Sequence, residues 1–157
     1  MNHQSVAIVD FPETTVAVKE HRGDPELIGK SVMEFIEWRR LNHLHPSVGA
    51  TFNILYGDPA GSDSENYRID LCVAVEREMS DPHYGIVPGS IPAGRCAVMR
   101  HIGTDDGLGA RIRQFLTEWL PDSGEQMRDY PMFLQRVRFY PEVPEIEAIS
   151  DIFLPIE

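Results

Sequence analysis

Apolar side chains recur with helical spacing in two stretches of the chain. In each stretch they occupy positions i, i+4, i+7 and i+8, which fall on one face of a helix. These positions are Ile28, Val32, Phe35 and Ile36 in the first stretch and Leu108, Ile112, Phe115 and Leu116 in the second. The pattern predicts two amphipathic helices, each with one apolar face that can pack on a sheet.

Polar residues mark where these helices begin. Asp24 followed by Pro25 predicts the start of the first helix, with the aspartate as its cap. Asp105 stands in the matching place before the second helix, where an acid suits the positive end of the helix dipole. His21 and His101 each lie in an HxG sequence at the preceding junction. We expect both histidines to make turn and cap hydrogen bonds, because no catalytic partner accompanies them.

Strand-like apolar segments follow each predicted helix. They cover 50–56 and 68–76 after the first helix, and 132–139 and 149–156 after the second. In the segment DLCVAV, alternate residues share one face, as in a half-buried strand. The sequence GDPAGSDSEN, residues 57–66, separates the first two strands and has the composition of a loop.

The two patterned regions are copies of one another. Residues 17–38 align with 97–119 at an offset of 80, and Trp38 then meets Trp119 at an offset of 81. The duplication predicts an α+β fold of two strand-helix-strand-strand halves related by a pseudo-two-fold axis. We expect one domain over 1–157, with the first half at about 6–76, a connector at 77–90 and the second half at about 91–157. The helices should cover the outside, and the open sheet faces should line a central groove.

Composition narrows the class of protein. The 157 residues carry 14 basic and 25 acidic side chains, a formal net charge of −11. This balance disfavours direct nucleic-acid binding, which needs clustered Lys and Arg. No apolar run reaches the length of a membrane span, and the N-terminus does not resemble a secretory signal. We therefore expect a cytoplasmic protein without membrane contact, in which Cys72 and Cys96 are buried free thiols.

Motifs for cofactor or catalytic chemistry do not stand out. The sequence contains no P-loop, GxSxG, HExxH or GxGxxG. His43 and His45 lack a third metal ligand at a known spacing. We therefore predict no catalytic residue, no metal site and no cofactor.

Several short motifs, in order along the chain, resemble the GyrI-like domain family. They are AVKEHRG (17–23), YGDP (56–59), IPAGRCAVMRHIG (91–103) and SDIFLPI (150–156). The family includes standalone DNA gyrase inhibitor proteins and the effector-binding domains of AraC-type and MerR-type transcription regulators. The resemblance implies the duplicated fold and a central groove that takes lipophilic, often cationic, small molecules. Because the resemblance covers nearly the whole chain, we expect this protein to be similar to the standalone members of the family.

One segment departs from the family pattern. Where members often carry PxFExY, this chain reads PMFLQR, so Leu134 replaces the acid and Arg136 replaces the tyrosine. Strand alternation predicts a groove-lining set of Tyr56, Leu134, Arg136 and Phe153, and Trp119 is a further ligand-binding candidate. Arg136 could bind an anionic ligand, or it could pair within the protein.

Three functions follow from these observations. The leading hypothesis is a non-enzymatic, effector-binding protein whose groove takes a lipophilic small molecule. The first alternative is inhibition of DNA gyrase by protein contact, with acidic residues as the footprint. These residues are Asp58, Asp63, Glu65, Glu142, Glu145 and Glu147. The second alternative is hydrolysis of a reactive natural product, which needs a groove carboxylate that the sequence does not place.

Overall fold

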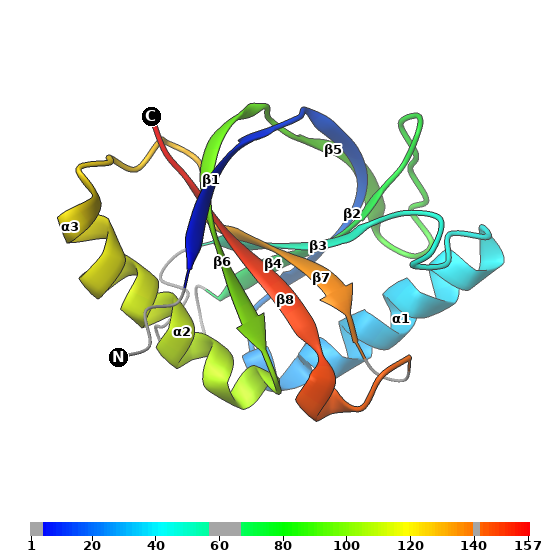
Figure 1. Cartoon of the computed structure of the whole chain (residues 1–157). Coiled ribbons are helices and arrows are strands. Elements are labelled where there is room, and N and C mark those ends of the chain that lie inside the picture. Colours follow the sequence, from blue (N-terminus) through cyan, green and yellow to red (C-terminus); the bar gives the residue numbers. More distant parts are fainter. Residues whose placement is uncertain (1–4, 57–66, 140–141) are drawn as a thin grey trace.

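A single curled sheet with helices on one face organises the chain (Figure 1). The computed structural model describes residues 5–56, 67–139 and 142–157. The strands are β1 (Val6–Phe11), β2 (Thr14–Arg22), β3 (Thr51–Tyr56), β4 (Arg68–Ala74), β5 (Ile86–Ile91), β6 (Gly94–Ile102), β7 (Phe133–Arg138) and β8 (Ile149–Pro155). The helices are η1 (Pro25–Leu27), α1 (Ile28–Leu41), η2 (Asp105–Gly107), α2 (Leu108–Gln114), η3 (Phe115–Trp119), α3 (Leu120–Ser123) and η4 (Glu145–Glu147). In the part of the chain described, no helix is both long and apolar enough to span a membrane.

The strand order shows the duplication directly. It runs β1-β6-β8-β7-β3-β4-β2-β5, with antiparallel neighbours throughout. Exchanging the equivalent strands of the two halves reproduces the same order read backwards. β3 and β7 therefore lie at the pseudo-two-fold axis. This confirms the predicted α+β class and the two related halves.

Each half has one strand more than the pattern predicted. β5 begins within the expected connector, residues 77–90, and ends one residue beyond it at Ile91. β1 pairs with β6 of the other half, and β5 pairs with β2. Each half thus contributes its first strand to the edge of the other half, so that neither sheet half is complete alone.

A π-helical turn explains the change of repeat offset along the chain. Phe115 matches Phe35 at an offset of 80, whereas Trp119 matches Trp38 at 81, and the π-helix η3 spans Phe115–Trp119. A π turn accommodates one additional residue without ending the helix. The offset of 81 then persists in the strands, since the pair Ile54–Asp70 corresponds to Gln135–Asp151.

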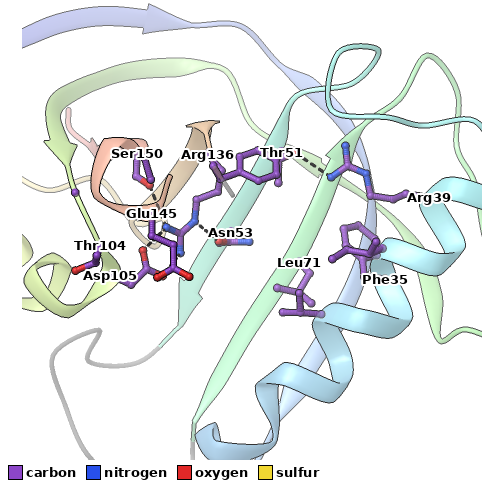
Figure 2. A pocket seen from close by; sticks show the side chains of 15 residues that line it. Phe35, Arg39, Thr51, Asn53, Leu71, Thr104, Asp105, Arg136, Glu145 and Ser150 are labelled. Atoms are coloured by element: carbon purple, nitrogen blue, oxygen red, sulfur yellow. Dashed lines mark hydrogen bonds and ion pairs between the residues drawn. The ribbon is translucent and has the colours of Figure 1, made fainter. Parts of the chain in front are cut away.

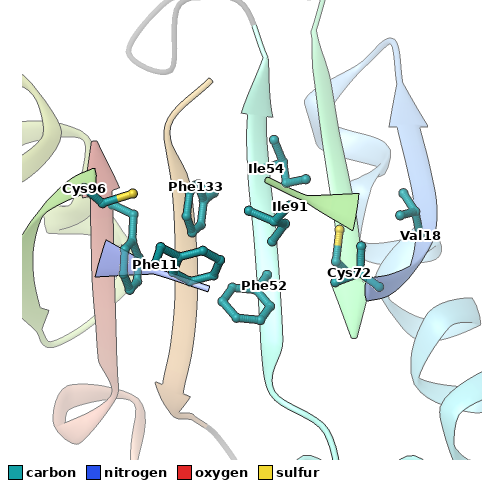
Figure 3. Close-up of a cluster of buried hydrophobic side chains, with 10 residues drawn as sticks. Phe11, Val18, Phe52, Ile54, Cys72, Ile91, Cys96 and Phe133 are labelled. Atoms are coloured by element: carbon teal, nitrogen blue, oxygen red, sulfur yellow. The ribbon is translucent and has the colours of Figure 1, made fainter. Parts of the chain in front are cut away.

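The helix-free face of the sheet is closed by packed aromatic side chains (Figure 3). Phe11 comes from the edge strand β1, yet its ring lies 5.0 Å from Phe133 and 5.9 Å from Phe52, on the two central strands. The sheet must curl over this face for an edge residue to reach the centre. Val18 from β2 and Ile91 from β5 join the same cluster from the other end of the sheet.

The opposite face packs against the helices. Phe35 and Trp38 of α1 pack on β2, β4 and β5, while Ile112 and Phe115 pack on β6, β7 and β8. The capping prediction for Asp24 is confirmed, because its Oδ1 accepts from the backbone N–H of Glu26 at 2.9 Å.

The predicted roles of the histidines and cysteines are also confirmed. His21 Nε2 lies 3.0 Å from the carbonyl oxygen of Asp24, and His101 Nε2 lies 2.8 Å from that of Thr104. Both histidines therefore hold the strand-to-helix junctions. Cys72 and Cys96 are buried free thiols.

Candidate functional site

A cavity of about 460 Å³ opens between the two helical segments, above the central strands (Figure 2). Its α1 wall contains Val32, Phe35, Ile36 and Arg39, which follow helical spacing along one face. Leu71 of β4 adds to the apolar surface. The cavity lies on the helix-covered face, whereas the sequence pattern placed the groove on the open face that the aromatic cluster fills.

Arg136 of β7 extends over the sheet from the other side of the cavity. Its Nε donates to Asn53 Oδ1 at 2.8 Å, and its Nη1 donates to Ser150 Oγ at 3.0 Å. Its two terminal nitrogens also donate to the two oxygens of Asp105, at 2.8 and 3.1 Å. Asp105 belongs to η2, so this bidentate ion pair ties the start of the second helical segment to the centre of the sheet. The structure thus shows Arg136 paired within the protein, one of the two alternatives left open by the sequence.

Arg39 is the second arginine of the cavity wall, and burial dominates its environment. Its side chain donates to the carbonyl oxygens of Leu44 and Gly49 and to Thr51 Oγ1, at 2.9, 3.2 and 2.9 Å. Desolvation lowers the pKa of the guanidinium to about 10, so it remains protonated at neutral pH. These bonds also hold the 42–50 segment against α1.

The strand register divides the predicted groove-lining residues between two faces. Arg136 pairs with Thr51, and Leu134 with Asn53, which places both on the helix-covered face. Tyr56 and Phe153 point to the opposite face. Phe153 stacks on Phe133 within the aromatic cluster, at a centroid distance of 4.8 Å. Tyr56 packs against that cluster under the guanidinium of Arg68. The expectation that these four residues share one surface is therefore wrong.

Leu134 and Trp119 do not line the cavity. Leu134 is 1% exposed and is packed among residues of α2 and β8. Trp119 contacts the same cluster, with its ring 5.4 Å from Phe115. Of the five predicted ligand-binding residues, Arg136 is the one placed in the cavity wall, and its role in binding stays a prediction.

Sequence reasoning missed Arg39 and Asp105 as cavity residues. Asp105 was assigned only to the helix dipole, because nothing in the local pattern links it to Arg136, 31 residues away. At the repeat offsets, Arg136 corresponds to Leu55, and Asp105 corresponds to Pro25. The ion pair is therefore specific to one half, and the cavity is asymmetric in a pseudo-symmetric fold.

Comparison with known proteins gives a family match over almost the entire chain. The model of the GyrI-like small molecule binding domain matches residues 4–157. The chain is 36% identical over 152 residues to the probable transcriptional regulator YgiV of Escherichia coli strain K12, covering 96% of this chain and 95% of that protein.

Solved structures share the fold at lower sequence identity. The crystal structure of the EcmrR C-terminal domain is 18% identical, with a TM-score of 0.73, over 98% of this chain and 97% of that one. A structure described as a hydrolase from Listeria innocua is 9% identical, with a TM-score of 0.64, over 98% of this chain and 92% of that one. At these identities the likeness concerns the fold alone.

Proposed function

Because the chain belongs to the GyrI-like small molecule binding domain family, we propose that it binds a lipophilic small molecule in the cavity between α1 and η2. The observation that carries this proposal is the cavity of about 460 Å³, which lies within the size range of small-molecule sites. Apolar side chains from α1 and β4 form one wall, and a few polar groups converge at Arg39 and Arg136. Such a wall can bury an apolar body while the polar groups fix its orientation.

The binding event would act as an effector signal. The relative YgiV is named a probable transcriptional regulator, which supports an effector-binding role for this chain. The cavity is bounded by α1 on one side and by the start of the second helical segment on the other. A ligand that contacts both would change the relative positions of the two halves, or lock them in place. Ligand binding would in this way alter the arrangement of the helices on the protein surface.

A non-enzymatic role agrees best with the carboxylates of the cavity. Asp105 accepts from Arg136 at both oxygens, and Glu145 lies exposed at the rim. A general base for water attack needs a free carboxylate aimed at the substrate. We therefore propose binding rather than hydrolysis.

Contact with DNA gyrase stays a prediction. Three of the acidic residues expected in such a footprint, Asp58, Asp63 and Glu65, lie outside the described residues. The other three, Glu142, Glu145 and Glu147, are exposed, and Glu145 lines the cavity. A salt-sensitive effect of the protein on supercoiling would support this alternative.

A thermal-shift screen with a cavity-filling variant tests the proposed function. A ligand at about 100 times its Kd adds about 2.7 kcal/mol to the free energy of unfolding. For a chain of this length, that raises the Tm by about 5–11 °C. Val32→Trp should fill the cavity and abolish the shift, whereas Met33→Trp, at an exposed neighbouring position outside the cavity, should keep it. A hit that both variants bind equally would place binding elsewhere, and a library without hits would count against small-molecule binding.

A further inference from the structure

Arg39 is a buried cation whose contacts are all neutral. The residue is 6% exposed, and its side-chain hydrogen bonds go to two backbone carbonyls and one hydroxyl. The ring of Phe35 lies 5.8 Å from the guanidinium carbon. Among the residues that the structure describes, none supplies Arg39 with a carboxylate. Burying a charge without a counter-charge is costly, so this arrangement favours an anion that arrives from outside the chain.

The other charges of the cavity are already balanced or solvated. Arg136 shares a bidentate ion pair with Asp105. Glu145 is exposed at the rim, where water screens its charge. The unbalanced charge at depth is therefore positive and belongs to Arg39.

The guanidinium of Arg39 also keeps donor capacity. Of its five N–H groups, three donate to Leu44, Gly49 and Thr51. One N–H remains on each terminal nitrogen, without an acceptor in the described part of the chain. Each of these N–H groups can donate a charge-assisted hydrogen bond to a carboxylate oxygen.

Apolar surface adjoins this cation within the same cavity. Val32, Phe35 and Arg39 of α1 all line the cavity. Leu71 of β4 lies opposite Phe35 and Arg39 (Figure 2). Thr51, which accepts from Arg39, is the register partner of Arg136 and marks the floor between the two arginines. A molecule with an apolar body and one carboxylate would be complementary to this apolar surface and the adjoining guanidinium.

We propose that the ligand is a carboxylate-bearing amphipathic molecule whose carboxylate pairs with Arg39 and whose apolar body lies over Phe35 and Leu71. This inference rests on the proposed function, because it assigns the charge of the ligand of that same cavity. It differs from the expectation of a cationic ligand that the family resemblance suggested.

Three isosteric probes test the sign of the charge on the unaltered protein. They are biphenyl-4-carboxylate, biphenyl-4-carboxamide and biphenyl-4-carboxamidine, which share one body and carry negative, neutral and positive planar groups. Isothermal titration calorimetry at pH 7 should show the carboxylate binding about tenfold to a hundredfold tighter than the amide, and the amidine weaker still. That ratio corresponds to about 1.4–2.8 kcal/mol. No binding of the carboxylate, or an amidine as tight as the carboxylate, would overturn the inference. Binding of the amide or amidine at the cavity would leave the proposed function intact.

Substitutions then assign the carboxylate to its partner. Arg39→Gln should remove the preference for the carboxylate over the amide, and Arg39→Lys should keep part of it because the charge is retained. Arg40→Gln, at the exposed neighbouring position, is the matched control and should leave all three affinities unchanged. A full carboxylate preference in Arg39→Gln would contradict the assignment. If the glutamine variant does not fold, NMR spectra of the unaltered protein test the contact instead. The side-chain Nε–Hε signal of Arg39 should shift when biphenyl-4-carboxylate is added, and the absence of a shift would refute the contact.

Discussion

Replacing Arg136 by alanine tests how much its hydrogen bonds and its ion pair contribute to the free energy of unfolding. The substitution removes hydrogen bonds to Asn53 and Ser150, both of which are buried residues. A buried polar group that loses its partner costs about 1–3 kcal/mol, and water entering through the cavity reduces the sum for two such groups. We therefore expect Arg136→Ala to lower the free energy of unfolding by about 2–3 kcal/mol.

Replacing Asp105 removes the ion pair but leaves the hydrogen bonds of Arg136 to Asn53 and Ser150 in place. The Asp105 side chain is 66% exposed, against 20% for Arg136. Exposed ion pairs contribute about 0.2–1 kcal/mol, so Asp105→Ala should cost less than about 1 kcal/mol. Asp106→Ala changes an exposed neighbouring acid, serves as the control, and should cost almost nothing.

Thermal and urea unfolding measure this difference. At about 2–4 °C per kcal/mol, Arg136→Ala should lower the Tm by about 4–12 °C and Asp105→Ala by at most about 4 °C. Equal losses for the two variants would refute the reasoning, because they would make the ion pair the main contribution of Arg136. The double variant should lose little more than Arg136→Ala alone.

Four further predictions follow from the described contacts. Phe11→Ala should cost about 3–5 kcal/mol in urea unfolding, since this ring joins an edge strand to the central aromatic cluster; a loss under about 1 kcal/mol would contradict that role. Asp24→Ala should cost about 1 kcal/mol through the lost helix cap, and an unchanged Tm would speak against the cap. Burial raises the pKa values of Cys72 and Cys96, so both thiols should resist iodoacetamide at pH 8 until denaturant is added. Mass spectrometry follows the labelling, and rapid labelling of the native protein would disprove their burial. The Kd of biphenyl-4-carboxylate should stay constant from pH 6.5 to 8.5, because Arg39, with a pKa of about 10, keeps its charge in this range and no histidine is among the described lining residues. A titration step in that range would mean that another group controls binding.

Local patterns predicted the elements well where a single period decides the structure. The helical spacing from Ile28 to Ile36 gives the start of α1, which extends to Leu41 in the structure. The strands expected at 68–76 and 149–156 are found at Arg68–Ala74 and Ile149–Pro155. β5 was missed because Pro88 and Gly89 resemble a connector. An edge strand tolerates such residues, since one side of its backbone needs no partner.

The site was harder to predict because it depends on register and on distant contacts. Alternation within β3 predicts which residues of that strand share a face with Tyr56. It does not predict whether Phe153, on β8, lies on the same face of the sheet, because that depends on the strand register. If the offset of 80 continued past the helix, Tyr56 would correspond to Arg136, but the π turn shifts this correspondence to Leu55. The contact between Asp105 and Arg136 arises only when the second helical segment lies over β7.

A methyl NMR titration with the tightest compound of the screen tests the central claim most directly. If the ligand binds between the helices, the methyl signals of Val32, Ile36 and Leu71 should shift in proportion to occupancy. The signals of Val18 and Ile54, which lie in the aromatic cluster of the helix-free face, should change little. Shifts confined to Val18 and Ile54 would place binding on the other face and contradict the account.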